Sequence, residues 1–439
     1  MQNLNLSQVK FTNQSDVVNP GTEIFNPKFS QVSALRGNDQ FIGTGNLTGD
    51  FALSAFAKSG ALDSDAIAST NLSSSPTVAV DGIKNEGSIN TNLGCDIVRG
   101  IATAKIAATA ETMSQVIAIA NTANAGAIAD AFADLNIKAT ANGIDNSGGQ
   151  INSGQGNDTV DGDTIGSVAA VAVASADASA IVDAICKAPM SEGLTAVAGA
   201  IATSLAQATL SATGIKNVGG IITSGKGNDN ISASATSSSD SFISGSFSSL
   251  TSPPTPGNQA LAIAVLNATA NASDQAIAID NTGGGFIRTG TGDDTINATA
   301  KASDKAIAID NVTGSITTGT GDDTILAQAT GSDSYGIFGG RIDMGQGDDR
   351  LIASSFAGGA NIDMGQGQDF VQGFGSATVD GGKGYDILSL GSYNKDSFKI
   401  GFGPNNGANF QLDGITMTTT GFEQFQFAGG VTYTYNQLI

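Results

Sequence analysis

Two columns of apolar residues recur along the chain at fixed distances from a short acidic turn. A β-branched residue stands seven positions before each turn aspartate, and a second apolar residue stands two positions after it. The first column is Val32, Ile89, Ile151, Ile222, Ile287, Ile316, Ile342, Ile362 and Val379, and the second is Phe41, Val98, Val160, Ile231, Ile296, Ile325, Leu351, Val371 and Leu388. The pattern predicts a strand entering a turn and a strand leaving it, with the copies stacked as a parallel solenoid.

The spacing between copies predicts the shape of each coil. The turn reads Gly-x-Gly-[Asn/Asp]-Asp-x-apolar at 154–160, 225–231, 290–296, 319–325 and 345–351. Further copies at 365–371 and 382–388 have Gln368 and Tyr385 before the aspartate, and weaker copies lie around Asp39 and Asp96. From Asp294 onward the turn aspartates are 29, 26, 20 and 17 residues apart. Two short strands and two turns need roughly 18 residues, so the longer intervals leave room for a third strand. We expect an all-β fold, a three-sided parallel β-helix upstream that narrows to a two-sided β-roll.

The third side of the coil is visible as a repeated hexapeptide. Ala-Ile-Ala-Ile-Asp-Asn occurs at 276–281 and again at 306–311, with its isoleucines on one face of a strand. An asparagine closes this side at Asn85, Asn146, Asn217, Asn281 and Asn311. These asparagines suit either a hydrogen-bonded ladder along the solenoid or a separate Asx turn in each coil.

The earlier turns are 57, 62, 71 and 65 residues apart, much more than one coil needs. The segments 125–146, 196–217 and 257–281 align with later coils but carry small residues in place of the acidic turn. We interpret them as extra coils without a charged turn, which leaves loops near 176–195 and 236–257. Helices in the alanine-rich stretches 113–134 and 176–206 are the alternative.

Composition excludes several classes of function. The chain has 439 residues, no His, two Cys, and 40 acidic against 19 basic residues, for a net charge of −21. Without histidine there is no Ser-His-Asp or Cys-His catalysis, and two cysteines cannot form a disulfide framework. We expect Cys95 and Cys186 to be unpaired. The acidic charge disfavours nucleic acid, and no apolar run is long enough to span a membrane.

The stacked turns predict a metal site. Turn aspartates about 5 Å apart would repel one another, and a hard cation between them would remove that cost. Calcium accepts six to eight oxygen ligands in flexible geometry, so calcium is the expected cofactor. The candidate ligands are Asp294, Asp323, Asp349, Asp369 and Asp386, the turn residues Gly290, Gly292, Gly319, Gly321, Gly345, Gly347, Gly365, Gly367, Gly382 and Gly384, and, upstream, Asp229 and Asp158. Extra coils would separate the upstream turns from one another, so each of these would bind weakly or not at all.

The turn resembles the nonapeptide of the RTX (repeats-in-toxin, haemolysin-type calcium-binding) family. Residues 381–389, Gly-Gly-Lys-Gly-Tyr-Asp-Ile-Leu-Ser, match its pattern G-G-x-G-x-D-x-U-x. The resemblance implies a parallel β-roll with calcium between stacked turns, liganded by loop carbonyls and the motif aspartate, and export by a type I system. Two features depart from the family. The motif occurs once per coil, and its first glycine is replaced by Ser153, Ser224, Thr289, Thr318, Met344 and Met364.

These observations define an expected organisation. Residues 1–31 form an N-terminal cap, 32–389 the solenoid, and the aromatic-rich segment 390–439 a C-terminal β cap that also serves as a type I secretion signal, by family resemblance. The first ten residues lack the features of a signal peptide.

The leading hypothesis for function is a secreted calcium-binding solenoid without enzyme activity, with a structural, cell-surface or matrix role. It would fold on binding calcium outside the cell, and its partners would be calcium and either itself or a cell-surface polysaccharide. The alternatives are a polysaccharide lyase or epimerase on a β-helix, and an adhesin or ice-binding face, suggested by Thr317 and Thr318.

Overall fold

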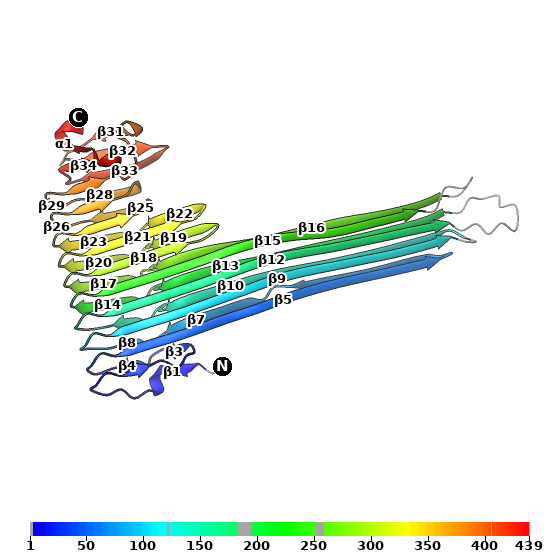
Figure 1. The fold of residues 1–439 in the computed structure, drawn as a ribbon, viewed down its shortest axis with the longest axis horizontal. Coiled ribbons are helices and arrows are strands. Elements are labelled where there is room, and N and C mark those ends of the chain that lie inside the picture. The colour runs from blue at the N-terminus through cyan, green and yellow to red at the C-terminus, as the bar shows by residue number, and fades with distance from the viewer. Residues whose placement is uncertain (1–2, 121–122, 183–194, 252–258, 405, 439) are drawn as a thin grey trace.

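The computed structural model describes residues 3–120, 123–182, 195–251, 259–404 and 406–438. Most of these residues lie in parallel strands that stack into an upright column (Figure 1). The strand that enters each turn belongs to a first stack, made of β4 (Gln31–Ser33), β8 (Ser88–Asn90), β11 (Gln150–Asn152), β14 (Ile221–Lys226), β17 (Phe286–Thr291), β20 (Ser315–Thr320) and β23 (Arg341–Gln346).

Two further stacks complete the coils. The strand that leaves the turn is β5 (Gln40–Leu62), β9 (Ile97–Ala120), β12 (Thr159–Val182), β15 (Asn230–Thr251), β18 (Thr295–Lys301), β21 (Thr324–Thr330), β24 (Arg350–Ala353), β27 (Phe370–Gln372) or β30 (Ile387–Ser389). The third side is β6 (Asp65–Ser74) with β7 (Thr77–Asn85), then β10 (Ala125–Asp145), β13 (Thr195–Lys216), β16 (Gln259–Asp280), β19 (Lys305–Asp310) and β22 (Asp333–Phe338).

The column narrows towards its C-terminal end. The single strand β25 (Phe356–Asp363) pairs with β22 through Phe356 and with β23 through Ile362, so it replaces two sides of the earlier coils. The strands β26 (Gln366–Gly367), β28 (Gly375–Asp380) and β29 (Lys383–Gly384) continue this narrower form. The predicted fold class, a three-sided parallel β-solenoid that narrows to two sides, is confirmed.

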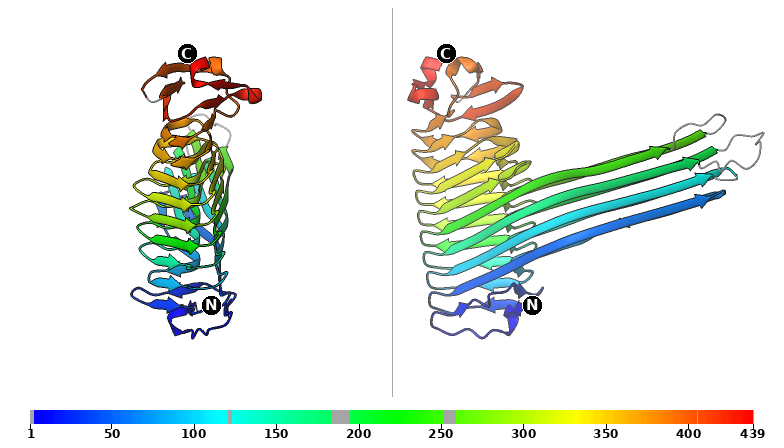
Figure 2. Two further views of the ribbon diagram at one scale, coloured as in Figure 1. Left: turned by 90° about the vertical axis from the view of Figure 1, so that its left-hand side faces the viewer. Right: turned by 45° about the vertical axis from the view of Figure 1, so that its right-hand side comes forward.

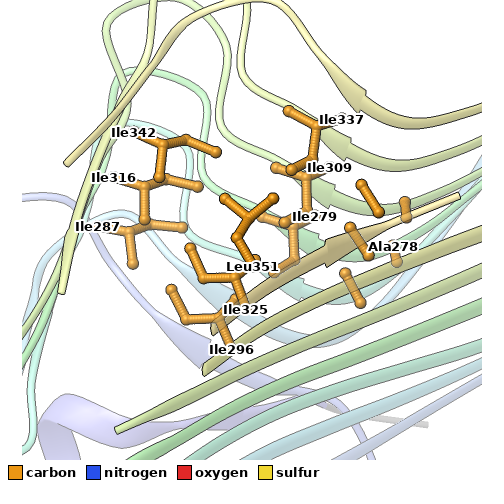
Figure 3. Close-up of a cluster of buried hydrophobic side chains, with 14 of the residues drawn as sticks. Ala278, Ile279, Ile287, Ile296, Ile309, Ile316, Ile325, Ile337, Ile342 and Leu351 are labelled. Carbon is orange, nitrogen blue, oxygen red and sulfur yellow. The ribbon is translucent and has the colours of Figure 1, made fainter. Parts of the chain in front are cut away.

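The interior of the solenoid column is built from the two predicted series of apolar residues, one before and one after each turn aspartate. Members of each series are direct partners in the parallel register, for example Ile287 with Ile316 and Ile296 with Ile325. Their side chains are buried and lie above one another, facing those of the third side (Figure 3). The β-branched residues fit because each coil presents the same narrow interior to the next.

The asparagines at the corner of the third side form a ladder. The side-chain amide of Asn85 donates to Oδ1 of Asn146 at 2.6 Å, and that of Asn217 donates to Oδ1 of Asn281 at 2.8 Å. The series extends one coil further than predicted, to Asn26. Because these residues are fully buried, each amide satisfies the next, and the ladder rather than isolated Asx turns is the correct interpretation.

Eight strands leave the column on one side and form a long arm (Figures 1 and 2). We call the arm the parts of β5, β6, β9, β10, β12, β13, β15 and β16 that extend beyond the column. The strands β9 and β10 belong to one coil, one in each sheet, and pair in parallel with β12 and β13 of the next coil. The arm therefore has two layers, each continuous with one side of the solenoid.

The prediction of extra coils is wrong. Segments 125–146, 196–217 and 257–281 fall in β10, β13 and β16, which are single long strands in the described residues. The alternative of helices at 113–134 and 176–206 is also wrong for the residues that are described. Of the two predicted loops, residues 176–182, 195 and 236–251 are strand, whereas 183–194 and 252–257 lie outside the described residues.

The interior of the arm differs from that of the column. It is a separate core made almost entirely of alanine, for example Ala108 and Ala170 from one sheet with Ala131 and Ala202 from the other. Inward positions alternate with outward ones along each strand. Because small side chains fill the interior, the two sheets can pack face to face over the whole length of the arm.

Short elements close both ends of the column. The N-terminal end comprises β1 (Leu4–Asn5), η1 (Leu6–Gln8), β2 (Val17–Val18) and β3 (Ile24–Asn26). The C-terminal end comprises η2 (Lys395–Ser397), β31 (Lys399–Phe402), β32 (Ala408–Leu412), β33 (Ile415–Thr420), β34 (Gln424–Gln426), η3 (Ala428–Gly430), β35 (Thr432–Thr434) and α1 (Tyr435–Leu438). Here the pairing becomes antiparallel, and Phe410, Phe422 and Phe425 are buried against the last coils. Across the described ranges, no helix has the length and hydropathy that crossing a membrane requires.

Candidate metal centre

The turn aspartates form one unbroken row along the column. The backbone N–H of each donates to Oδ1 of the aspartate in the next coil, as in Asp323 to Asp349 at 2.8 Å. The row is Asp39, Asp96, Asp158, Asp229, Asp294, Asp323, Asp349, Asp369 and Asp386. It ends at Glu423, whose carboxylate accepts from the N–H of Asp386 at 2.9 Å. All nine turns are therefore neighbours.

The upstream turns belong to this row, so the expectation that extra coils isolate them is wrong. The N–H of Asp158 donates to Asp229 at 2.9 Å, and the N–H of Asp229 donates to Asp294 at 2.8 Å. No additional coil separates them, because the chain between these turns extends along the arm in β12 and β13, and then in β15 and β16. Asp39 and Asp96, the weakest motif copies, occupy the same structural position as the others.

The second oxygen of each aspartate has no hydrogen-bond partner. Among the described residues, Oδ2 of all nine aspartates is buried and unpaired. The side chains are at most 2% exposed. A buried carboxylate oxygen without a partner costs free energy unless it is protonated or bound to a cation. The repetition of the same unpaired atom in nine consecutive coils indicates a property of the turn rather than an accident at one position.

The raised pKa values of the row aspartates also favour a bound cation. Burial raises the pKa of Asp349 to about 8, with the neighbouring carboxylates of Asp323 and Asp369 raising it further and the N–H of Asp323 lowering it. Burial likewise raises the pKa of Asp158 and of Asp369 to about 7. It raises the pKa of Asp229, Asp323 and Asp386 to about 6. A cation beside the row would favour the charged form and offset this cost.

A second row of hydrogen-bonded aspartates, exposed to solvent, runs beside the buried row of turn aspartates. The N–H of Asp322 donates to Oδ1 of Asp293 at 2.9 Å, and the N–H of Asp348 donates to Oδ1 of Asp322 at 2.8 Å. These bonds run back to the preceding coil, whereas those of the buried row run forward. These residues are not among the predicted ligands, although the motif shows Asn or Asp at this position in most copies.

The turn glycines are required by stacking. Gly321 has φ = 127°, and a Cβ there would lie 2.0 Å from the carbonyl oxygen of Gly292 in the coil before. Gly319 and Gly290 are related in the same way, with φ = 118° and a distance of 2.0 Å. The glycine carbonyls therefore point along the stack towards the next turn. These oxygens belong to the same turns as the carboxylates, and some already accept a backbone hydrogen bond, as Gly154 does from Lys226 at 3.0 Å.

The residues that replace the first glycine of the motif are inside the column. The hydroxyl of Ser224 donates to the carbonyl of Thr289 at 3.1 Å, and that of Thr289 donates to the carbonyl of Thr318 at 3.0 Å. In the last coils Met344 and Met364 occupy this position and are fully buried. The departure from the RTX pattern is therefore accommodated inside the column, where the hydroxyls of Ser224 and Thr289 also lie near Asp229 and Asp294. There they lower the pKa of these carboxyls, against the larger effect of burial.

The residues of this edge fit a hard divalent cation. Every donor is oxygen, from carboxylates and backbone carbonyls, which is the set that calcium prefers. Among the described residues, no group of three or more Asp, Glu, Cys or His side chains is placed to hold a metal ion by itself. A cation between two stacked turns would therefore take one or two side-chain ligands, and backbone carbonyls would complete its coordination shell. Cys95 lies in one of these turns, exposed and unpaired, and Cys186 lies outside the described residues.

Comparison with known proteins gives little further information. No protein-family model matches the chain, and no curated protein has a significant sequence match to it. A structure search finds a solved structure described as a hyperactive, Ca²⁺-dependent, β-helical antifreeze protein from an Antarctic bacterium. The two chains share 14% identity with a TM-score of 0.22, over 98% of this chain and 93% of the other. The fold assignment rests on the strand pairings of this chain alone.

Proposed function

We propose that this protein is a calcium-stabilised structural solenoid that works outside the cell. The observation that carries the proposal is the row of nine buried aspartates, each with an unpaired Oδ2. Calcium bound between stacked turns would supply the missing partner of each oxygen. Asp294, Asp323, Asp349, Asp369 and Asp386 would contribute carboxylates, and the turn carbonyls of the adjoining glycines the remaining oxygens. Asp158 and Asp229 join this set because their turns are also stacked.

The expected stabilisation is large compared with that of a domain. A site with a Kd near 0.1 mM facing about 10 mM calcium contributes about 2.7 kcal/mol. Several such sites together reach the 5–15 kcal/mol that typically holds a domain folded. A calcium-poor cytosol would leave the chain without this contribution, so calcium outside the cell would drive its folding.

The proposed location follows from the same chemistry and from the RTX resemblance. Extracellular calcium is abundant, and the resemblance implies export through a type I system with the signal within 390–439. The segment 390–439 can serve both as the export signal and as a cap, because it covers the last coil once folded. A tagged chain expressed in its native host tests the location: the proposal requires it in the medium or on the cell surface.

One groove of the column does not favour the enzyme alternative. A groove along the turns of the first coils is lined by Lys226 and Arg288 together with Asn, Gln, Ser, Thr, Gly and Leu residues, without a carboxylate or an aromatic ring. Lyases and epimerases of the kind considered would need acid and base groups there. The ice-binding alternative loses one of its two threonines, because Thr318 is buried inside the column.

Calorimetric titration of the metal-free protein, with circular dichroism in calcium and in chelator, tests the proposal. We expect several calcium ions bound per chain and a thermal midpoint that rises with calcium concentration. Magnesium at the same ionic strength is the matched control and should give a much smaller shift, because it demands octahedral geometry and retains water. An unchanged β signal and unchanged midpoint in chelator would refute the proposal.

A further inference from the structure

The arm ends in an open edge on its C-terminal side. The strand β15 pairs with β18 only over residues 230–236, and β16 pairs with β19 only over residues 275–280. In the described residues, 237–251 of β15 and 259–274 of β16 therefore have no strand beside them on that side. We call these two segments the upper edge of the arm.

Backbone hydrogen-bonding groups point out of this edge. The carbonyl of Asp229 accepts from Thr295 in the next coil, whereas Asn230 donates to the coil before. The register of β15 with β12 runs without a shift to Thr251. Odd-numbered residues of β15, including Ile243, Phe247 and Ser249, therefore direct their N–H and C=O groups to the open side. An unpaired row of this kind is a template for another strand.

The upper edge also leaves core-facing apolar side chains uncovered. Ile243 and Phe247 stand in register above Ala172 and Ala176, which are 0% and 1% exposed. Ile243 is nevertheless 55% exposed and Phe247 is 74% exposed, because no further strand lies over them on the open side. Large apolar side chains that face the interior from the last pair of strands would be buried by a further pair of strands.

The edge has none of the usual protection against pairing. Segment 237–251 contains one charged residue, Asp240, and 259–274 contains one, Asp274, and neither contains proline. Asp274 is buried, and its carboxylate accepts from the hydroxyl of Ser237 at 2.7 Å and from the N–H of Ser303 at 3.0 Å. Natural edge strands usually carry lysine, proline or a bulge that prevents association. In a chain of net charge −21 this is a nearly neutral region, so a second copy can approach it without electrostatic repulsion.

The column decides which orientation a second copy can take. The coils that follow β16, and the C-terminal cap, rise beyond the base of the arm on the column side (Figure 1). A copy translated along the column would need the space that these coils occupy. A copy related by a two-fold axis perpendicular to the sheets places its own column beyond the tip of the first arm. That arrangement pairs each edge strand with its own equivalent in antiparallel orientation.

We propose that the upper edges of two copies pair, β15 with β15 and β16 with β16, to form a two-fold symmetric dimer. The arms then form one continuous two-layered sandwich with a column at each end. A closed, isologous contact of this kind satisfies both edges at once and leaves the calcium edge free. The proposal concerns the arm and stands independently of calcium binding by the turns.

Sedimentation velocity and electron microscopy at saturating calcium test the dimer. We expect a particle of twice 43.7 kDa with two columns at opposite ends of a shared bar. Phe247→Lys would place a charge in the new interface and is tolerated in a monomer, where the side chain is exposed. We expect at least a tenfold weaker dimer for F247K. Ser249→Pro removes an edge-facing N–H and should weaken the dimer similarly.

Ser244→Lys is the matched control, because Ser244 lies on the same strand with its side chain on the outer face of the sheet. It adds the same charge and should leave the dimer intact. A folded wild-type chain that stays monomeric at about 100 µM (about 4 mg/ml), equal effects of F247K and S244K, or assemblies with all columns on one side would overturn the proposal. A monomer that still binds calcium would leave the proposed function standing.

Discussion

The N–H of Asp323 donates to Oδ1 of Asp349 at 2.8 Å, while Oδ2 of Asp349 is buried without a hydrogen-bond partner. One oxygen of the carboxylate therefore holds two coils together, and the other is available to a cation. This division of roles repeats in nine coils. It explains why one residue type at one position serves both the fold and the candidate metal edge.

Replacing Asp349 by Asn should remove calcium-dependent stability while keeping the inter-coil hydrogen bond, since the amide oxygen can still accept. We expect a loss of about 2–3 kcal/mol of the calcium-dependent free energy of unfolding. Asp158→Asn should lose a similar amount, because the structure places its turn between two neighbours as well. Thermal unfolding with and without calcium measures both.

Asp413→Asn controls for the change in charge, since Asp413 is exposed in the hairpin turn between β32 and β33. Its calcium response should equal that of the wild type. A D158N chain that keeps its full calcium response while D349N loses it would show that the upstream turns bind no metal.

The metal-free protein should be more stable in mild acid than in mild base. The folded-state pKa of Asp349 is about 8 and that of Asp158 is about 7, both above the ordinary value of 3.8. Groups with a raised folded pKa contribute stability below their unfolded pKa and lose it as pH rises through the folded value. The thermal midpoint in chelator should therefore fall between about pH 5 and pH 8.

Calcium should reverse this trend, because a bound cation replaces the proton at Oδ2. The midpoint at about pH 8 should then equal or exceed that at about pH 5. The same scan on the Asp349→Asn chain should show a shallower fall in chelator, and an identical fall in both chains would contradict the assignment to this row.

Gly321→Ala should disrupt the candidate edge. The new Cβ would lie 2.0 Å from the carbonyl oxygen of Gly292, at a φ of 127° that alanine rarely adopts. We expect destabilisation of more than about 3 kcal/mol, or failure to fold, measured by urea unfolding in calcium.

Gly199→Ala is the matched control, since Gly199 lies in the arm strand β13 with an ordinary strand φ and open space where the new methyl group would lie. It should be neutral or slightly stabilising. Equal effects of the two substitutions would show that the turn glycines have no special role.

Asn217→Ala should cost about 1–3 kcal/mol, because it leaves the buried amides of its neighbours unpaired. Asn217 accepts from Asn146 at 2.7 Å and donates to Asn281 at 2.8 Å. The exposed Asn271 in β16 provides the control, and its replacement by Ala should change the unfolding midpoint only slightly. Amide exchange should rise around the ladder in N217A and stay unchanged in N271A.

Much of the column could be predicted from the sequence. Each coil needs a β-branched residue, two glycines and an aspartate at fixed spacing, because every coil meets the same steric environment in its neighbour. That requirement is local and repeats, so it is visible in residues such as Ile287, Gly290 and Asp294. The sequence did not show that Asp293 and Asp294 belong to separate rows. The direction in which each side chain leaves the backbone decides which of the two is buried.

The arm was decided only by tertiary structure. An alternating run such as Ala131–Leu135 has the same local pattern in a short solenoid strand, in a long arm strand and, because of its alanine content, in a helix. What distinguishes them is pairing with residues far away along the chain, as between Ala131 and Ala202. The sequence by itself therefore determined the coil and its acidic turn, whereas the length of the strands and the contiguity of all nine turns depended on the packing of one sheet against another.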